Sequence, residues 1–297
     1  MDRILQYEIA QKLGEGKNGE AYLALDSGLQ RAVLIKTLKH DRRLGDEHRR
    51  TTFLELMARF NALENVGVAR FYSLEQAENC WVAVREYIDG QTIAELIRAE
   101  PLAYKRWLDT ALQLARTLKV LHDAGLVHGN ITAANVFVTS GKSISLTDYA
   151  FGAVWTGCDD RADNVYLAPE LVGSNDRTVL GDLYSLGVVL FILLTGRVPE
   201  RSDGRSEDAL FDGLSETGAP GVARLLLKRL MAPDPKDRFG SADELILTLQ
   251  GMISLGTEPE VSETRRKWSP TPRQYLLLAL LFLLLIILWL AITSHPR

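Results

Sequence analysis

The sequence predicts an α+β protein of two lobes, a small β-rich N-lobe and a mostly helical C-lobe, followed by one transmembrane helix. Apolar and polar residues alternate in a strand-like way up to about residue 38. Helical spacing dominates from residue 182 to about 252, and an uncharged apolar run lies near the C-terminus. Strands first and helices afterwards are typical of the α+β class.

The predicted elements follow one another in a simple order. Strands cover residues 9 to 38, with a hairpin turn at residues 26–28, and a second strand pair covers 135–148 with a turn at residues 140–141. Helical patterns lie at 49–64, 92–99 and 104–125.

Composition bounds the kind of protein. A chain of 297 residues makes one or two domains. The formal net charge of −4 argues against nucleic acid as a partner. Two cysteines, Cys80 and Cys158, are too few for a disulfide scaffold and favour a reducing compartment.

The apolar run at 274–294 has no charged residue, proline or glycine. As a helix, its last 20 residues would span about 30 Å, the thickness of the hydrocarbon core of a bilayer. A buried core helix is the alternative, but such helices are usually shorter or amphipathic. We therefore predict a single membrane span, with the membrane as a partner.

Basic residues before the span predict its orientation. Four lie on the N-terminal side: Arg265, Arg266, Lys267 and Arg273. The positive-inside rule then places residues 1 to about 274 in the cytoplasm. Residues 251–273 form the predicted juxtamembrane linker, whose basic cluster either lies against anionic lipid or serves topology alone.

A glycine motif lies in the first strand hairpin. The stretch LGEGKNGEAYLA places Gly14, Gly16 and Gly19 in a G-x-G-x-x-G pattern, where backbone N–H groups can close over phosphates. A dinucleotide-binding fold would need a helix after the glycines, and here a strand follows. With Lys36 in AVLIK, the pattern resembles the protein-kinase set.

Further motifs extend this resemblance over residues 7–250, the predicted kinase-like domain. They are VREYIDGQTIAELI (84–97), LVHGNITAANVFV (126–138), LTDYAFG (146–152), YLAPEL (166–171), GDLYSLGVVLFILLTGRVP (181–199) and DPKDRF (234–239). In their order and spacing they resemble the eukaryotic-like Ser/Thr protein kinases, including the bacterial members. Because bacterial members are often membrane-anchored, we expect a bacterial inner membrane as the location; a tail-anchored protein of a eukaryote is the alternative.

The resemblance implies a role for each matching residue. Lys36 would contact the α- and β-phosphates of ATP, oriented by Glu55, and Glu86 would contact the nucleotide from the hinge. Asn135 and Asp148 would ligate Mg²⁺, which prefers oxygen ligands. ATP and Mg²⁺ are therefore the expected cofactors.

Other matches imply the internal frame of the large lobe. Glu170 would pair with Arg238, and Asp182 would brace the catalytic loop through its backbone N–H groups. The register of the helix that carries Glu55 is open, since its apolar pattern also permits the glutamate position at Leu56.

The catalytic loop departs from the family pattern H-R-D-[LI]-K-x-x-N, because this chain reads HGNITAAN. Gly129 replaces the arginine, Asn130 the aspartate that accepts the substrate proton, and Thr132 the lysine. An amide is no general base near neutral pH, so we expect impaired phosphoryl transfer. Asp148-Tyr149-Ala150 also replaces D-F-G.

Two departures lie at the adenine site, where Leu34 replaces an alanine and Arg85 stands in an apolar position. The charge of a buried Arg85 must reach solvent or a partner. The leading hypothesis is a membrane-anchored pseudokinase that binds ATP and Mg²⁺ and signals by docking a protein partner. The alternatives are a slow but active Ser/Thr kinase and a nucleotide-free scaffold.

Overall fold

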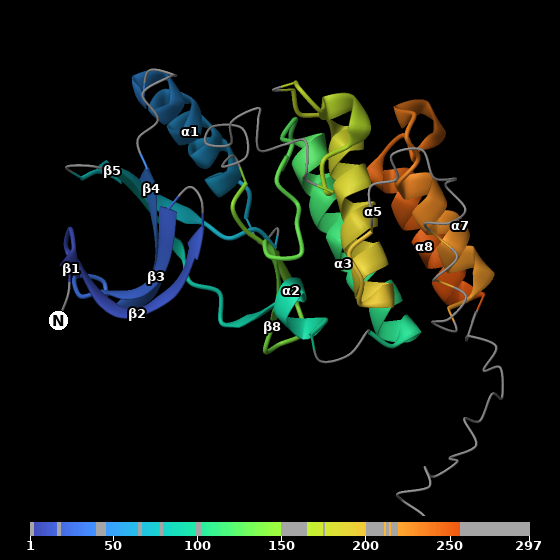
Figure 1. Ribbon diagram of the computed structural model, residues 1–297, viewed down its shortest axis with the longest axis horizontal. Coiled ribbons are helices and arrows are strands. Elements are labelled where there is room, and N and C mark those ends of the chain that lie inside the picture. Colours follow the sequence, from blue (N-terminus) through green and yellow to red (C-terminus); the bar gives the residue numbers. More distant parts are fainter. Residues whose placement is uncertain are drawn as a thin grey trace, which may run out of the picture. The chain divides into compact units, whose positions relative to one another are not determined.

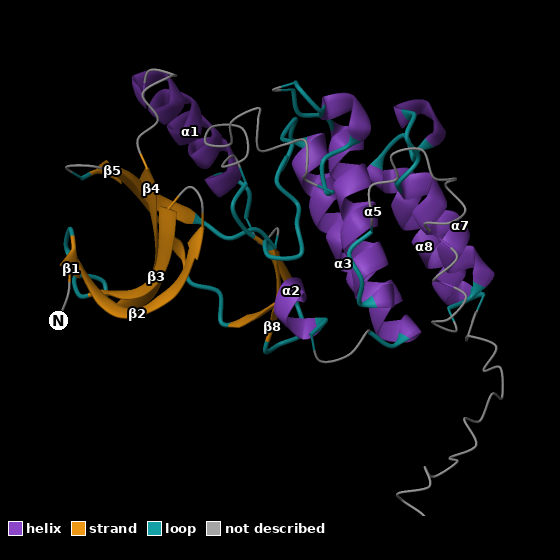
Figure 2. Cartoon of the chain, in the orientation of Figure 1, coloured by secondary structure: helices purple, strands orange, loops and turns teal. Residues whose placement is uncertain are grey.

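The computed structural model describes residues 3–16, 19–39, 46–64, 67–77, 80–98, 102–149, 165–174, 176–199, 211, 214 and 219–255. All of them belong to one compact unit, Met1–Pro259. Within this unit a β-rich lobe precedes a mostly helical lobe (Figure 1), and the cartoon coloured by secondary structure separates the two clearly (Figure 2). The predicted order of strands before helices is confirmed.

The β-rich lobe is built on a six-stranded antiparallel sheet with the strand order β1-β2-β3-β4-β6-β5. Its strands are β1 (Arg3–Ile4), β2 (Tyr7–Gly16), β3 (Gly19–Asp26), β4 (Arg31–Lys39), β5 (Phe71–Gln76) and β6 (Cys80–Glu86). The Asp26 carboxylate accepts a hydrogen bond from the Leu29 N–H at 3.1 Å, which closes the predicted β3–β4 turn.

Helix α1 (Asp46–Asn61) packs beside β5 through one apolar face. Phe53 and Phe60 are seven residues apart, so they lie on the same side of the helix, and both are buried. The Phe53 ring meets Phe71 of β5 edge to face, with 5.2 Å between centroids. The helix predicted at 49–64 is thereby confirmed, three residues nearer the N-terminus.

The helical lobe contains α3 (Tyr104–Asp123), α5 (Val179–Thr195), α7 (Gly221–Leu230) and α8 (Ala242–Ser254). Helix α3 packs against α5 and α8, and α5 packs against α7. Short turns of helix complete the lobe: α2 (Ile93–Leu96), η3 (Pro169–Leu171) and η5 (Pro235–Asp237). Helix α5 is apolar on nearly every side, and it is accordingly almost entirely buried.

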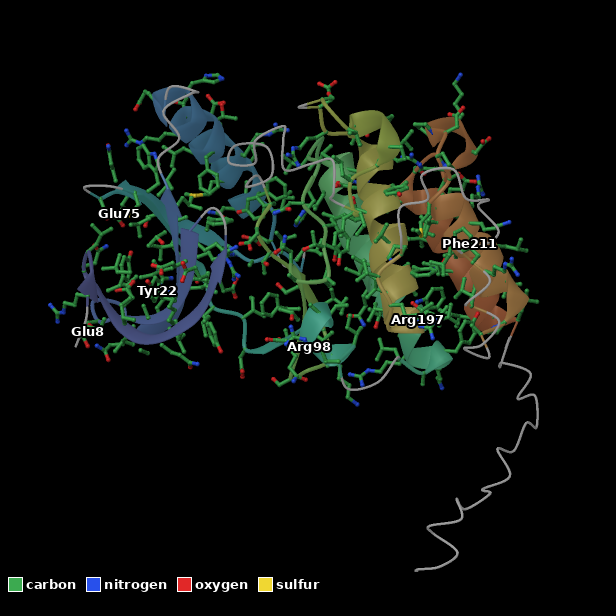
Figure 3. All side chains as sticks on the ribbon, in the orientation of Figure 1. Glu8, Tyr22, Glu75, Arg98, Arg197 and Phe211 are labelled. Carbon is green, nitrogen blue, oxygen red and sulfur yellow. The ribbon has the colours of Figure 1, made fainter. Side chains whose placement is uncertain are left out.

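Side chains fill both lobes (Figure 3), and the buried apolar ones form two clusters. One cluster fills a face of the large sheet with Tyr7, Ala24, Val33, Ile35, Val82 and Val84. A second, larger cluster runs from α1 and β5 into the helical lobe, where Phe211 meets Phe191 of α5 with 6.1 Å between ring centroids. The two lobes therefore share one continuous core.

A small sheet of order β7-β8-β9 connects the lobes. Its strands are β7 (Gly90–Thr92), β8 (Val136–Thr139) and β9 (Ile144–Leu146). Leu146 of β9 donates its N–H to the Gly67 carbonyl and accepts the Ala69 N–H, both at 2.8 Å. These bonds hold β9 against the segment before β5 and bring the residues after β9 close to the large sheet.

The predicted linker from residue 251 overlaps the end of α8, which runs to Ser254. The predicted membrane span at 274–294 lies outside the described residues. Within the ranges that the structure describes, no helix combines the length and apolarity that crossing a bilayer requires.

Candidate functional site

The carboxylate of Asp148 receives two cations, one on each oxygen. Lys36 of β4 donates from Nζ to Oδ2, and Arg85 of β6 donates from Nε to Oδ1 at 3.1 Å. The two basic residues lie on neighbouring antiparallel strands, with Lys36 opposite Ala83 and Arg85 opposite Leu34. The bonds that hold β9 to the large sheet bring Asp148 within reach of both.

This carboxylate is held in its charged form although it is buried. Burial raises the pKa of Asp148. The nearby charges of Lys36 and Arg85 lower it by more, so the pKa lies below its usual value. The side chains of Arg85 and Asp148 are only 3% and 4% exposed, whereas that of Lys36 is 30% exposed. The Arg85–Asp148 pair is thus the deep part of the cluster.

Lys36 has a different acidic partner from the predicted one. Glu55 is exposed on α1, and across the described ranges it forms no ion pair with Lys36. The neighbouring position, Leu56, is half-buried against the core, so the inward-facing position of α1 carries no carboxylate. Lys36 therefore bonds directly to Asp148.

Arg85 also engages the hinge residue Glu86. Its Nη1 donates to the Glu86 carbonyl at 2.8 Å, and its guanidinium lies 5.9 Å from the ring centroid of Phe137. The Glu86 carboxylate accepts the Arg70 N–H at 3.1 Å. The sequence required a partner for a buried Arg85, and the structure identifies Asp148 and the Glu86 carbonyl.

Asn130 is fixed by hydrogen bonds on both its side chain and its backbone. Its Nδ2 donates to the Asp148 carbonyl at 2.9 Å, and its own carbonyl accepts Asn135 Nδ2 at 2.9 Å. The Asn135 N–H in turn donates to the Thr132 carbonyl at 3.0 Å. The structure thus brings together Asn130, Asn135 and Asp148, as the sequence predicts, and the residue at the base position is an amide that carries no basic group.

Asp182 braces the catalytic loop through hydrogen bonds to its backbone. Its carboxylate accepts the N–H groups of His128 and Gly129, each at 2.8 Å, and lies 3.0 Å from His122 Nε2. This bracing was predicted and is confirmed. Three groups on one buried carboxylate fix the start of the loop.

The predicted pair of Glu170 and Arg238 is also confirmed. Both guanidinium Nη atoms donate to the carboxylate at 2.7 Å, in the bidentate arrangement that favours arginine. The same guanidinium donates to the carbonyls of Ala232 and Pro233. The described frame of the large lobe is therefore complete.

Gly129 adopts a backbone conformation that other residues rarely take, with φ at 66°. A Cβ added there would lie 2.4 Å from Cδ and 2.5 Å from Nη1 of Arg177. Arg177 Nη1 donates to the Gly129 carbonyl. The arginine that the family pattern places at 129 is thus replaced by a glycine, and another arginine fills the adjoining space.

His128 is fully buried next to this loop. Burial lowers its pKa to about 4, although the carboxylates of Asp182 and Asp148 act in the opposite direction. The Asn130 N–H donates to Nδ1 at 3.2 Å, which fits a neutral ring. His128 is therefore an uncharged part of the frame at neutral pH.

Tyr149 anchors the turn that carries Asp148. Its ring stacks on Phe60 with 3.8 Å between centroids and meets Phe71 edge to face at 5.0 Å. Its hydroxyl donates to Asn61 Oδ1 at 3.4 Å, and burial raises its pKa. Aromatic packing therefore fixes the backbone on which Asp148 stands, at φ 62°.

The glycine motif lies on the β2–β3 hairpin, with Gly16 paired to Gly19 and Gly14 to Ala21. Packing requires a glycine at position 19: its φ is 151°, and a Cβ would lie 1.6 Å from the Thr37 carbonyl oxygen. Around Gly14 a Cβ would meet open space. The phosphate-binding role of these three glycines stays a prediction.

Comparison with known proteins establishes the family. A family profile described as "Protein kinase domain" matches residues 7–247. The chain therefore belongs to the protein kinase family.

Known relatives are bacterial Ser/Thr protein kinases. Serine/threonine-protein kinase PrkC of Bacillus subtilis is 28% identical over 255 residues, covering 81% of this chain and 39% of that protein. Serine/threonine-protein kinase PknB of Mycobacterium tuberculosis is 24% identical over 261 residues, covering 81% and 42% respectively. The chain thus spans about two fifths of the length of these relatives.

A solved structure supports the fold alone. The kinase domain of Mycobacterium tuberculosis PknI superposes with a TM-score of 0.66 at 22% identity, covering 85% of this chain and 97% of that domain. The protein kinase fold predicted from the sequence is confirmed for the described residues.

The family implies ATP with a divalent cation, and the described residues fit these two groups unequally. The ammonium of Lys36 is partly exposed and suits a phosphate. A metal ion would need oxygens of Asp148 that already receive Lys36 and Arg85, and elsewhere in the described ranges no three His, Cys, Asp or Glu side chains gather. The arrangement fits a phosphate and does not fit Mg²⁺.

Two contacts of the site were not predicted from the sequence. The contact of Arg177 with Gly129 joins positions 48 residues apart, and no spacing rule connects them. The direct Arg85–Asp148 pair could be foreseen only in part: a buried arginine requires a partner, but the sequence does not say which one.

Proposed function

We propose that this chain is a pseudokinase, a kinase-fold protein that holds a nucleotide, transfers its phosphate poorly or not at all, and signals by docking a protein partner. The observation that supports it is the state of Asn130. Its amide occupies the base position and donates from Nδ2 to the Asp148 carbonyl at 2.9 Å.

The loss of a base has a definite size. General-base catalysis contributes roughly 10²–10⁴-fold to a rate, and kinases turn over at roughly 1–100 s⁻¹. A kinase that lacks only its base would keep about 10⁻² s⁻¹ at typical values. Thr132 and Gly129 remove two further charged groups of the family pattern, so a lower rate follows.

Nucleotide binding relies on the groups that remain. Lys36 offers a partly exposed ammonium, and the glycine hairpin lies at the end of the strand next to β4. ATP is therefore the ligand we assign to this site. The partner protein would recognise the nucleotide-bound form of the fold.

We assign the location from residues 251–297. The apolar run at 274–294, preceded by Arg265, Arg266 and Lys267, supports a single span with the kinase domain on the cytoplasmic side. Alkaline carbonate washing of bacterial membranes tests it: the full chain should stay in the membrane pellet, and a chain truncated after residue 255 should not. Release of the full chain would remove the tether from the proposal.

The deciding experiment measures phosphate transfer from γ-labelled ATP by the full chain in detergent micelles. Wild type, Asn130→Asp and Asp148→Asn are compared at equal concentration. We expect wild type to stay at background, and a gain of label in Asn130→Asp would show that the missing proton acceptor alone prevents transfer. Labelling of wild type that disappears in Asp148→Asn would instead identify a slow kinase.

A nucleotide-free scaffold is the second candidate, and a specific observation favours it. Arg85 and Leu34, the two residues that depart from the family pattern at the adenine site, are both buried and lie opposite each other. Arg85 also donates to the Glu86 carbonyl, so these two side chains take up space at the adenine site. Titration with millimolar ATP separates the two functions, since a ligand that binds the folded state raises its melting temperature. An unchanged melting temperature would select the scaffold.

A further inference from the structure

The starting point is the charge balance around Asp148. One carboxylate receives an ammonium on Oδ2 and a guanidinium on Oδ1, so two cations meet on Asp148. The deep half of this cluster is the Arg85–Asp148 pair, whose side chains are 3% and 4% exposed. A buried arginine cannot lose its charge, so this pair is a permanent feature of the site.

The same geometry opposes a divalent cation. A magnesium ion on Asp148 Oδ1 would stand about 2.1 Å from that oxygen and so within about 5 Å of Arg85 Nε, which is 3.1 Å from the same oxygen. Lys36 holds the other oxygen. Two fixed cations therefore repel the metal at the carboxylate that it would need.

The second predicted metal ligand adds little. Asn135 is tied to the loop because its Nδ2 donates to the Asn130 carbonyl at 2.9 Å. It can offer one neutral amide oxygen, whereas magnesium prefers six oxygen ligands with at least one carboxylate. Without a free carboxylate on Asp148, the described residues supply a weak ligand set.

Arginine is well suited to act where the metal would act. A guanidinium presents five N–H donors, of which the bonds to Asp148 and Glu86 use two. Its planar fork matches the oxygens of a phosphate, and it is always charged. A phosphate that reaches Lys36 therefore comes close to a second cation that the protein itself provides.

We propose that Arg85 replaces the divalent metal at this site, so that the protein binds a nucleoside triphosphate as the metal-free anion through Lys36 and Arg85. The inference rests on the proposed nucleotide binding and specifies its chemistry. The two cations attract the phosphates, and the Arg85–Asp148 pair keeps Asp148 from recruiting magnesium.

Isothermal titration calorimetry with ATP tests it on the full chain in detergent micelles, once in EDTA and once in millimolar MgCl₂. We expect wild type to bind ATP in EDTA with a Kd within threefold of that in MgCl₂. Binding by wild type only in MgCl₂ would overturn the inference and leave the proposed function intact. Binding in neither buffer would overturn both.

The variant Arg85→Met should lose at least tenfold in ATP affinity in EDTA and recover most of it in MgCl₂, because Asp148 is then free for the metal. Arg98→Met is the matched control: Arg98 is exposed beyond α2 and labelled in Figure 3, and its loss should leave both Kd values unchanged. An Arg85→Met protein that still binds ATP normally in EDTA would refute the role of Arg85. If Arg85→Met does not fold by circular dichroism, the wild-type comparison still decides.

Discussion

Two groups of residues, the frame of the large lobe and the candidate site, differ in how far they follow the family pattern. In the frame, Asp182 accepts the N–H groups of His128 and Gly129, and Arg238 forms a bidentate pair with Glu170. In the candidate site, Asn130 replaces the base, and Asp148 is paired with Arg85, an arginine that the family pattern does not have. The frame is preserved, while the residue at the base position and the partner of Asp148 have changed.

The difference shows which interactions the fold itself demands. A buried charge pair destabilises strongly when one partner is removed, so the frame residues are held by stability. A catalytic base contributes to a rate and little to folding, so it can be lost without unfolding the lobe. The retained frame is therefore no sign of activity, and conclusions about function depend on the altered candidate site.

The largest effect should come from breaking the frame. In Arg238→Ala the Glu170 carboxylate and three backbone carbonyls lose a guanidinium whose side chain is 0% exposed. We expect the free energy of unfolding to fall by about 3–5 kcal/mol. Urea denaturation of the full chain in detergent micelles, followed by circular dichroism, measures it.

A matched pair nearby provides the control. Arg229 bonds Glu244 at the surface, with side chains 43% and 42% exposed. Arg229→Ala should therefore lose no more than about 1 kcal/mol. Equal losses in the two variants would mean that burial of the Arg238 pair does not matter, and the contrast between frame and surface would fail.

The next effect is a pH dependence that comes from His128. Its pKa of about 4 lies below the value of about 6.5 for an unfolded chain, so the unfolded state binds more protons between these pH values. The stabilisation is complete above about pH 6.5 and is lost as the pH falls towards 4. We expect a loss of about 3 kcal/mol over this range, measured from urea midpoints at pH 7 and pH 4.5.

Two variants identify the group responsible. His128→Leu removes the titrating ring and should flatten the dependence between pH 6.5 and 4. His48→Gln, at an exposed position of α1, should leave the dependence as in wild type. Asp148 acts at lower pH, because its depressed pKa makes it lose stabilisation only below about pH 4. An unchanged slope in His128→Leu would assign the dependence elsewhere.

The sequence predicted the parts of this molecule that depend on local pattern. Apolar alternation located β2, β3 and β4, and helical spacing located α1 and α3. Strands β5 and β6 were missed because β6 is buried on both faces and shows no alternation: CWVAVRE has five consecutive buried residues. The frame contacts of Glu170, Arg238 and Asp182 were predicted through the resemblance to protein kinases.

The site was predicted in composition and only partly in its contacts. Lys36, Asn130, Asn135 and Asp148 do meet, but Lys36 reaches Asp148 where the motif implied Glu55. That outcome depends on the turn of α1 that faces inward, which presents Leu56. Helix register and long-range pairs such as Arg177 with Gly129 are set by tertiary packing, which spacing along the chain does not encode.

The smallest predicted effect tests whether Gly129 and Arg177 depend on each other for stability. Gly129→Ala places a Cβ at φ 66°, against Cδ and Nη1 of Arg177. We expect a loss of about 1–2 kcal/mol from the backbone conformation, with a further contribution of about 1 kcal/mol from the crowded side chain. A double-mutant cycle with Arg177→Ala, read by urea denaturation, separates the two: the crowding contribution should disappear and the backbone contribution should remain. Additive losses would show that Gly129 and Arg177 are independent. A coupling of the expected size would instead mean that the glycine at position 129 leaves the space that the Arg177 side chain occupies.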